Sequence, residues 1–473
     1  MDDIVAAAES MRRGGVLDYE FVLCLEPFFQ RHGYWEKAAT IFAAFLHSAE
    51  EAQDWYAVVQ LVLQQAKFLS LRGKLPEASR VLKSLDSYIS RVEPEASRRR
   101  AMAMWLNTQG GVFQRMGRFD DAVSAFEQSA SFEEELENPG GVAKILNSLG
   151  GVLQRKGAFD KAAQMFRQSA TIDRELGNQR GEAMTLNGLG GVLQRQGDFN
   201  GAVGIFRRSG DLLSAVGDLR GQAMVLTSLG GVLQRQGDFA GACDVFRRSA
   251  AIEAGLGNDR GQAIVLNSLG GVLQRQGKFD EAVDAFRRSY DVEVALENAR
   301  GQAMVLNSLG GVLQRQGKFD EAVDALRKSH AISKDLGDQR SVAMVLNSLG
   351  GVLQRQGKFV EAVEAFRRSQ VISEELGDQR SVAMVLNSLG GVWQRQGKFV
   401  EAVEAFRRSQ VISEELGDQR SVAMVLNSLG GVWQRQGRFA EAVDALRRSY
   451  DIEVTLENTR GQAMVLNSLG GAL

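Results

Sequence analysis

The chain has 473 residues, 44% of them hydrophobic and 24% charged, with 52 glycines but only four prolines. This apolar content is typical of folded proteins and excludes wholesale disorder. Fifty-six basic and 58 acidic residues leave a formal charge of −2, so the composition indicates no bulk attraction to nucleic acid or to anionic membranes.

The two cysteines, Cys24 and Cys243, are too few for a disulfide framework. We therefore expect a cytoplasmic protein in which both thiols are small buried side chains. The N-terminal segment lacks the basic and apolar regions of a signal peptide, and no apolar run is long enough to span a membrane. The sequence thus predicts no membrane partner.

The first hundred residues predict an irregular beginning to a repeated structure. Residues 1–15 are expected to form a short leading helix or a tail, and residues 16–100 two divergent repeat units. Gly33 and Gly73 are 40 residues apart, and each begins a similar pattern, whereas Gly73 and Gly117 are 44 residues apart. The difference predicts a four-residue insertion at 92–100.

From residue 101 onward the chain repeats itself almost perfectly. The string LNSLGGVLQRQG recurs with small changes, and its Gly-Gly pair appears ten times at a spacing of 40 residues, from 110/111 to 470/471. We count nine regular units at 101–460 and a lone first helix at 461–473. A fixed period of this length indicates one elongated solenoid rather than several globular domains.

Each unit is predicted to contain two helices. In residues 341–380, apolar side chains from Leu346 to Leu353 fall at helical spacing, and Gly357 then ends the first helix. A second helical pattern follows, and Asp378 is placed to cap the next helix. No segment alternates with the period of a strand, so the fold class is all-α, an α-solenoid of helix-turn-helix repeats.

The repeated positions resemble the tetratricopeptide repeat. The pattern is carried by Leu146, Leu149, Gly150, Leu153, Gly157, Phe159, Ala162 and Phe166 and recurs along most of the chain. Two features depart from it: the small residue late in the second helix is a serine (Ser169, Ser289, Ser369), and the closing proline is absent. The 40-residue period is similar instead to the long-repeat subclass, which includes kinesin light chains, Leu-Gly-Asn repeat proteins and sensor arrays of bacterial signal-transduction NTPases.

This resemblance implies a right-handed superhelical solenoid that serves as a non-catalytic scaffold for protein–protein interaction. The residues agree, because the sequence contains no phosphate-binding loop, no dinucleotide fingerprint, and no zinc or nucleophile motif. The acidic pairs Glu374/Glu375 and Glu414/Glu415 recur with the period, which favours a solvated helix face over an acid–base pair. We predict no enzyme activity, no cofactor and no metal.

One polar stripe runs along each first helix. In residues 341–380 it contains Asn347, Gly351, Gln354 and Arg355, which lie within about 120° of one another on a helical wheel. The resemblance implies that this stripe faces the concave groove in which ligands bind. The predicted ligand residues are Asn147, Asn187, Asn267, Asn307, Asn347, Asn387, Asn427, Arg155, Arg195, Arg235, Arg275, Arg315, Arg355, Arg395, Arg435, Gln314, Gln354 and Gln394.

The chemistry of the stripe indicates the type of ligand. Asparagine and glutamine both donate and accept hydrogen bonds, which suits an extended peptide backbone, and arginine pairs with carboxylates. We therefore predict an extended, acidic peptide or protein segment. The first glycine of each pair is expected to let the partner helix approach, and the second to let another backbone approach the groove.

Alternatives remain open at this point. The near identity of the units is also what recent duplication produces, and the asparagines could instead bond between adjacent first helices as a structural ladder. The alternative function is a ligand-sensing array of a signal-transduction NTPase whose motor domain is absent from this chain. Nucleic acid is not expected, because residues 341–380 carry five basic and five acidic residues.

Two further expectations concern apolar side chains. Trp393 and Trp433 replace leucines on the apolar stripe and should be buried between helices. At the end of the chain, helix 461–473 carries apolar side chains that would pack on a following helix. We expect this helix to act as a simple cap with its far side partly exposed; the alternative is self-association through this segment. These side chains are Val465, Leu466, Leu469 and Leu473.

Overall fold

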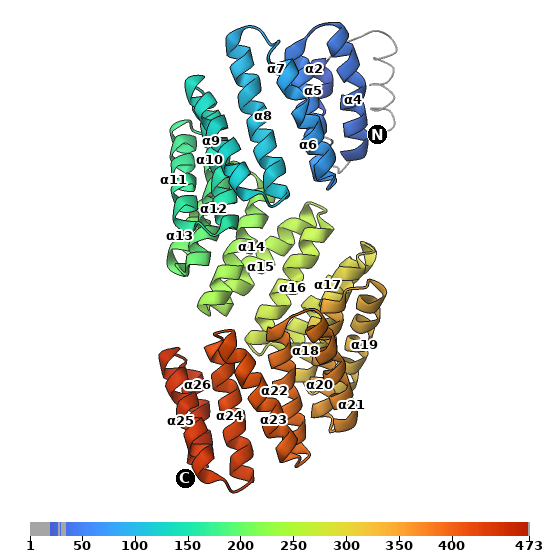
Figure 1. Ribbon diagram of the computed structural model, residues 1–473, viewed down its shortest axis with the longest axis vertical. Coiled ribbons are helices and arrows are strands. Elements are labelled where there is room, and N and C mark those ends of the chain that lie inside the picture. The colour runs from blue at the N-terminus through green and yellow to red at the C-terminus, as the bar shows by residue number, and fades with distance from the viewer. Residues whose placement is uncertain (1–18, 27–28, 30–34, 472–473) are drawn as a thin grey trace. The chain divides into compact units, whose positions relative to one another are not determined.

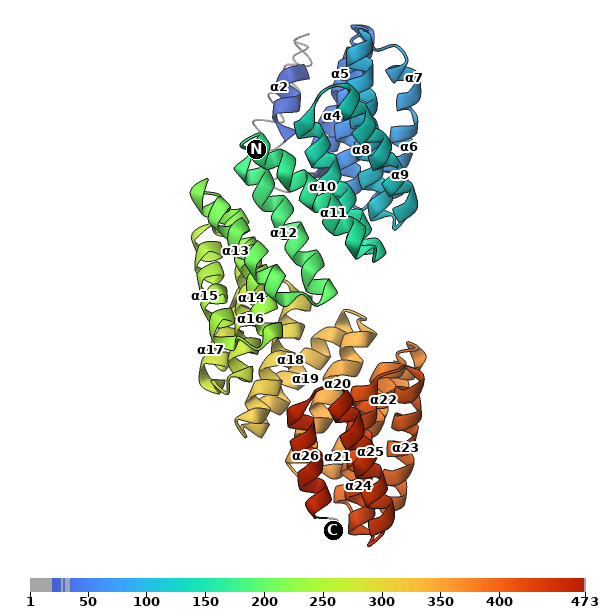
Figure 2. The same ribbon diagram turned by 90° about the vertical axis from the view of Figure 1, so that its left-hand side faces the viewer.

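A computed structural model describes residues 19–26, 29 and 35–471 (Figure 1, Figure 2). Every element of these described residues is a helix, and successive helices pack in pairs along the chain, so the prediction of an all-α solenoid is confirmed. The superhelical sense, a property of the whole array, stays a prediction. The expected leading helix or tail at 1–15 lies outside the described residues.

We call the first helix of each repeat the A helix and the second the B helix. The A helices are α5 (Trp55–Leu71), α8 (Glu95–Arg115), α10 (Pro139–Lys156), α12 (Gln179–Gln196), α14 (Leu219–Gln236), α16 (Asp259–Arg275), α18 (Ala299–Arg315), α20 (Gln339–Arg355), α22 (Gln379–Arg395), α24 (Gln419–Arg435) and α26 (Thr459–Gly470). The B helices are α4 (Trp35–Glu51), the broken pair α6 (Leu75–Lys83) and α7 (Leu85–Ile89), α9 (Phe119–Glu135), α11 (Phe159–Glu175), α13 (Phe199–Ala215), α15 (Phe239–Gly255), α17 (Phe279–Ala295), α19 (Phe319–Asp335), α21 (Phe359–Glu375), α23 (Phe399–Glu415) and α25 (Phe439–Thr455). The short helix α2 (Tyr19–Cys24) comes before them.

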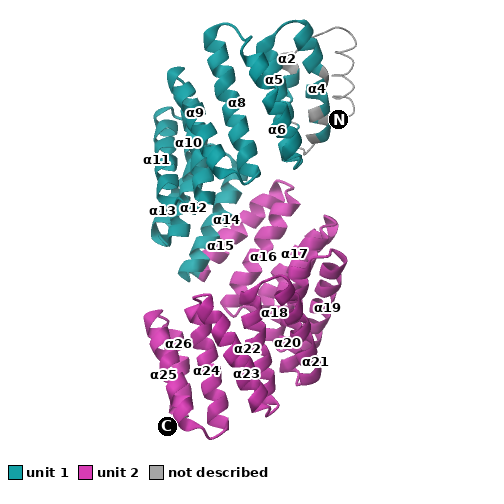
Figure 3. Ribbon diagram, viewed as in Figure 1, with its two compact units in different colours: residues 1–238 teal, residues 239–473 magenta. Residues whose placement is uncertain are grey.

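The chain divides into two compact units, residues 1–238 and residues 239–473 (Figure 3). The division falls between α14 and α15, so it separates an A helix from the B helix that follows it. Within each unit, every helix from α8 onward packs against the next one along the chain.

The predicted helix boundaries follow from local chemistry. The carboxylate of Asp378 accepts a hydrogen bond of 3.2 Å from the backbone N–H of Ser381 and so caps α22. Gly357 has a φ of +78°, the left-handed conformation in which glycine commonly ends a helix. Both expectations are confirmed, and the same cap-and-glycine pattern recurs in neighbouring repeats.

The first glycine of the pair has the packing role that was predicted. A Cβ atom on Gly350 would lie 2.8 Å from Cδ1 of Phe366, closer than side chains approach one another in proteins. The Phe366 ring is only 1% exposed and therefore rests directly on the backbone of α20. Where leucine replaces the phenylalanine, as at Leu326, it packs on Gly310 in the same way.

The serine that departs from the family pattern ties the two helices of a repeat together. Ser369 is 1% exposed, and its hydroxyl donates to the backbone carbonyl of Ala343 at 2.7 Å. A buried hydroxyl needs such a partner, because an unpaired one is costly. Equivalent bonds join Ser129 to Ala103, Ser169 to Ala143, Ser209 to Ala183, Ser289 to Ala263, Ser329 to Ala303, Ser409 to Ala383 and Ser449 to Ala423.

Three B helices end on a glutamate where six others end on glycine, and this predicts a stabilising substitution. Glu297 has a φ of +51°, whereas its counterparts Gly337 and Gly377 have φ of +66°. Since a side chain in this conformation costs about 1 kcal/mol, Glu297→Gly should raise the free energy of unfolding by about that amount in chemical denaturation. Glu374→Gly, inside α21, should lower it by about 1 kcal/mol. A loss of stability in Glu297→Gly would contradict the argument.

The N-terminal repeats differ in helix length. Helix α8 has 21 residues where α20 has 17, and the four additional residues (21 − 17) lie at its start, within the predicted insertion segment 92–100. Four residues add about one helical turn. The core here is aromatic: the rings of Phe42 and Phe68 stack with centroids 5.7 Å apart.

The expectation about the cysteines is half correct. Cys243 is 3% exposed, and burial raises the pKa of its thiol above the ordinary value. Cys24, however, is exposed at the end of α2, so the prediction that it is buried is wrong. Cys24 lies on a six-residue helix, and a helix this short offers few neighbouring side chains that could bury it.

The two tryptophans lie in the apolar core of the last repeats. Trp433 is 8% exposed, as expected, while Trp393 is partly buried against the same cluster. In a separate apolar cluster with Leu446, Val465 of α26 is 2% exposed, but Leu466 is 51% exposed. The corresponding Leu426 is 1% exposed. Leu469 is partly buried, and Leu473 lies outside the described residues.

Candidate peptide-binding face

In each unit the A helices lie on the inner side. Consecutive A helices contact one another, as α20 does α22 and α22 does α24, and no consecutive pair of B helices in the described chain approaches as closely. Unit 1 has the same arrangement in α10, α12 and α14. A stack that is tighter on one side bends toward that side, so each unit curves around its A helices.

We define the A-helix face as the stripe of exposed and partly exposed positions that runs along each A helix. In α20 these are Arg340, Met344, Asn347, Gly351 and Arg355. The two arginines and the methionine are exposed, and the asparagine and glycine are partly exposed. The exposed Met344 therefore lies between two arginines, one near each end of α20.

Charge is separated between the two layers of helices. Helices α14, α18, α20, α22 and α24 each carry two arginines and no carboxylate. Helix α21 carries four glutamates and only two arginines, and α23 repeats this. The neutral sum over residues 341–380 thus conceals a basic A layer and an acidic B layer.

The predicted arginines at the ends of the A helices are exposed and unpaired. None of Arg155, Arg195, Arg235, Arg275, Arg315, Arg355, Arg395 and Arg435 forms an ion pair with a described residue. Some arginines at the start of these helices do form ion pairs, since Arg300 pairs with Asp338 at 3.0 Å and Arg180 with Asp218 at 2.7 Å. Others there, such as Arg340, form none with a described residue, so free cationic groups lie at both ends of the face.

The glutamines pack on the following repeat instead of projecting freely. The amide nitrogen of Gln354 lies 3.5 Å from the place where a Cβ on Gly391 would stand, and Gln314 and Gln394 lie similarly at Gly351 and Gly431. In the last repeat Gln434 donates to the carbonyl of Ser468 at 2.7 Å. A Cβ at 3.5 Å would make only an ordinary contact with Gln354, and at Gly231 and Gly271 it would meet nothing within 4 Å. The expectation that the second glycine leaves space for a ligand backbone therefore stays a prediction.

The asparagines lie between successive A helices. Their carbonyl oxygens are buried and have no hydrogen-bond partner among the described residues at Asn187, Asn267, Asn307, Asn347, Asn387 and Asn427. Asn467, which no described A helix follows, is exposed, so the next repeat is what covers the others. The suggested structural ladder through these oxygens is not present in the described part of the chain.

Two hollows open on the A-helix face, one in each unit. In unit 1 a hollow of about 340 Å³ brings together Gln154, Asn187, Gly191, Gln194 and Thr227, all members of the predicted stripe. In unit 2 a hollow of about 180 Å³ is lined by residues of α20, α21 and α22 and their connection. Its lining residues are Arg340, Ala343, Met344, Asn347, Ser369, Ser373, Leu376, Asp378, Ser381, Met384 and Val385.

The acid at the rim of the second hollow is held in its charged form. The backbone N–H of Ser381, followed by the Ser381 hydroxyl, keeps the pKa of the Asp378 carboxyl below its ordinary value. Because the pKa is lowered in the folded chain, this cap stabilises the fold at neutral pH and loses its effect only as the pH falls through the acidic range. Asp378 is therefore an anion beside the hollow at neutral pH.

A row of exposed methionines is the feature that sequence reasoning missed. Met304, Met344, Met384 and Met424 are 46–49% exposed, one on each successive A helix of unit 2. The position lies three residues before the predicted asparagine and is continued by Met184, Met224, Ile264 and Met464. The recurring apolar residue beside the polar stripe was the signal in the sequence that could have predicted this row. The flexible thioether of methionine suits contact with apolar partners of varied shape.

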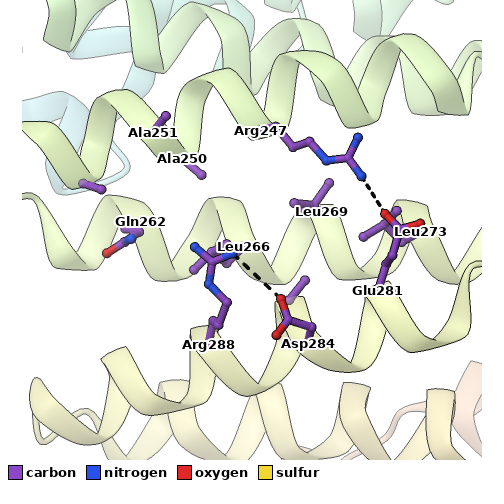
Figure 4. A pocket seen from close by; sticks show the side chains of 12 residues that line it. Arg247, Ala250, Ala251, Gln262, Leu266, Leu269, Leu273, Glu281, Asp284 and Arg288 are labelled. Carbon is purple, nitrogen blue, oxygen red and sulfur yellow. Dashed lines mark hydrogen bonds and ion pairs between the residues drawn. The ribbon is translucent and has the colours of Figure 1, made fainter.

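A third hollow, of about 500 Å³, lies on the B-helix side of unit 2 (Figure 4). Ala250, which lines it, stands at the position that Tyr290 occupies in α17. Arg247 of α15 reaches across it to Glu281 of α17 at 2.7 Å, and a dashed line marks this pair in Figure 4. Its charged groups pair with one another and none is a predicted ligand residue, so we assign no site there.

The family comparison agrees with the architecture. The profile described as "Tetratricopeptide repeat" matches residues 99–175, 141–215, 221–292, 301–375 and 381–452, well over half of the chain. The chain belongs to the tetratricopeptide repeat family. Repeats of this family typically form non-catalytic scaffolds for protein interaction. None of the curated proteins compared with this tetratricopeptide repeat chain matches it in sequence.

One solved structure, that of RapI, shares the fold at low sequence identity, and others match less closely. The apo form of RapI is 13% identical with a TM-score of 0.56, and the match covers 85% of this chain and 99% of RapI. A Rap protein complexed with Competence and Sporulation Factor is 15% identical with a TM-score of 0.44, covering 72% and 99%. Nearly identical repeats of a kinesin light chain from Podosopora anserina are 20% identical with a TM-score of 0.35, covering 41% and 96%.

No described helix combines the length and the hydropathy needed to cross a bilayer. No group of three or more histidine, cysteine or acidic side chains among the described residues is arranged to hold a metal ion.

Proposed function

We propose that this tetratricopeptide repeat array captures an extended, acidic peptide or protein segment on its A-helix face. The observation that carries the proposal is the row of unpaired arginines on a layer whose helices largely lack carboxylates. Arginine forms strong, directional bonds with carboxylates, and a surface of one charge also speeds the encounter with an oppositely charged ligand. The asparagines and glutamines lie beside this row and supply hydrogen bonds to the ligand backbone.

The experiment uses defined probes and the full chain. Fluorescence anisotropy is measured with a labelled 15-residue peptide of alternating Glu and Ala, and with a second peptide that has Lys in place of Glu. Binding of the acidic peptide alone, weakening as salt rises from 50 to 500 mM, is the expected result. Equal binding of both peptides, or binding of neither, would refute the proposal.

The alternative function uses the same surface. In a ligand-sensing array of a signal-transduction NTPase, the A-helix face would bind the signal and a separate motor domain would respond. No observation in the described residues favours this function over a scaffold, so we propose the scaffold, with a cytoplasmic location and a protein or peptide as partner.

The exposed end of unit 2 leads to a prediction about self-association. Leu466 of α26 is 51% exposed, whereas its counterpart Leu426 is 1% exposed, and water solvates such an apolar side chain poorly. If a second copy covers this surface, light scattering over a hundredfold dilution should show a mass that falls from dimer to monomer. Leu466→Glu should then give a monomer at every concentration. A constant monomer mass in the unmodified chain contradicts the association.

A further inference from the structure

Three consecutive junctions in unit 2 differ chemically from most others. Where a B helix meets the next A helix, the chain has Ser333, Asp338 and Ser341, and it repeats these types at 373/378/381 and at 413/418/421. We call these Ser-type junctions. Five other junctions have an acid, an asparagine and a glycine, and we call them acid-type: 133/138/141, 173/178/181, 253/258/261, 293/298/301 and 453/458/461.

In an acid-type junction the carboxylate fills the space between the helices. Glu293 is 3% exposed and accepts a hydrogen bond of 2.7 Å from the side-chain amide of Asn298. A Cβ on Gly301 would lie only 2.3 Å from this carboxylate, so glycine is required opposite it. The acid, the amide and the glycine therefore form one interlocking set.

In a Ser-type junction that space is open. The shorter Ser373 leaves the hollow of about 180 Å³ described above, whose apolar walls come from Met344, Leu376, Met384 and Val385. Every residue that lines this hollow has a residue of the same type 40 positions earlier and 40 positions later. The same side chains are thus available at all three Ser-type junctions.

Each Ser-type junction also contains polar groups without partners. The hydroxyls of Ser333 and Ser413 are buried without a hydrogen bond, as are the carbonyl oxygens of the adjacent Asn307 and Asn387. At the middle junction Ser373 is 1% exposed and lines the hollow, its hydroxyl has no partner among the described residues, and the Asn347 side-chain oxygen is again unpaired. Buried polar groups are nearly always paired, so a complementary group is missing.

We propose that each Ser-type hollow receives one glutamine side chain of the acidic ligand. The glutamine stem packs on the methionine thioethers, its amide N–H donates to the asparagine oxygen, and its amide carbonyl accepts from the serine hydroxyl. This inference rests on the proposed function, because the hollow is lined by Arg340 and Met344 of the same A-helix face.

The alternatives fit the hollow less well. A purely apolar side chain would leave the hydroxyl and the asparagine oxygen unpaired. A glutamate would have no proton to donate to that oxygen, and its charge would lie beside the ionised Asp378 at the rim. An uncharged amide satisfies both unpaired groups at once.

The test compares single residues in a constant acidic peptide. The alternating Glu–Ala peptide is made with Gln, Leu, Glu or Ala at its centre, and binding to the full chain is measured by anisotropy. The peptide with Gln should bind about three- to tenfold more tightly than the one with Leu, the range of one or two net hydrogen bonds. Replacing Ser333, Ser373 and Ser413 with alanine should remove this preference. Leu binding as tightly as Gln overturns the proposal.

The chain offers its own control for folding. Converting all three Ser-type junctions to the acid-type set, as in Ser373→Glu/Asp378→Asn/Ser381→Gly, uses a combination that four of its junctions already have. The converted protein should fold, keep its affinity for the peptide with Ala at the centre, and lose the preference for Gln. Retention of the preference would show that the hollows do not bind the amide.

A second readout separates this inference from the proposed function. Methionine methyl NMR of the full chain is recorded with N-acetyl-glutaminamide and with N-acetyl-leucinamide, neither of which is acidic. The methyls of Met344 and Met384 should shift only with the glutamine compound. If they shift although acidic peptides do not bind, the proposed function fails and the amide site stands. Unmoved methyls reject the amide site whatever the peptides do.

Discussion

Reversing the charge of three arginines on the A-helix face is expected to weaken binding of the acidic peptide by about a hundredfold. The variant carries Arg315→Glu, Arg355→Glu and Arg395→Glu, each in the exposed, unpaired row. Exposed charges contribute little individually, but each reversal replaces an attraction by a repulsion, and the three act on one ligand. Binding is measured by anisotropy, and helicity by circular dichroism.

A control with the same change in net charge uses the opposite layer. Arg287→Glu, Arg367→Glu and Arg407→Glu lie on B helices and should leave peptide affinity within about twofold, because exposed charges farther away than a Debye length are screened. If both variants lose affinity equally, the effect is due to total charge and the arginine row has no special role. Unchanged affinity in the first variant would exclude the row as the binding surface.

The largest expected effect on stability comes from the aromatic ring that packs on glycine. Phe366→Ala should lower the free energy of unfolding by about 3–5 kcal/mol, because it empties the space over Gly350 at the centre of a repeat. Because each repeat contacts mainly its neighbours, the repeats around Phe366 should then unfold at a lower denaturant concentration than the rest of the chain, as a separate transition. Chemical denaturation followed by circular dichroism measures both.

The chain again supplies the matched substitution. Phe366→Leu should cost far less, because Leu326 and Leu446 occupy the same position over Gly310 and Gly430. Similar losses in Phe366→Ala and Phe366→Leu would mean that ring shape, rather than the filling of space over the glycine, determines stability at this site.

Local rules were sufficient to predict most of the fold. Fixed spacing of the Gly-Gly pair gave the number of regular repeats, and the cap at Asp378 and the end at Gly357 follow from residue chemistry alone. The buried serine illustrates what local rules leave out. Its departure from the family pattern was visible in the sequence, but its partner, the carbonyl of Ala343, could be found only once both helices were placed.

The candidate site was predictable in composition but not in arrangement. The arginine row was predicted and is exposed, whereas the glutamines proved to pack on the next repeat, a contact that depends on the distance between A helices. The methionine row was overlooked because methionine is usually buried. The separation of basic A helices from acidic B helices was present in the sequence. It was overlooked because the charges of the two helices cancel when they are summed over a whole repeat.

The contact between glutamine and glycine has a consequence for how such an array changes its length. Gln354 meets Gly391 just as Gln394 meets Gly431, so each repeat presents to the next the surface that it receives from the one before. Residues 341–380 and 381–420 differ only at Leu353 and Trp393. Unequal recombination can therefore add or delete 40 residues without creating an unfamiliar interface. The length of the binding surface can then change with the number of repeats, while neighbouring repeats keep packing in the same way.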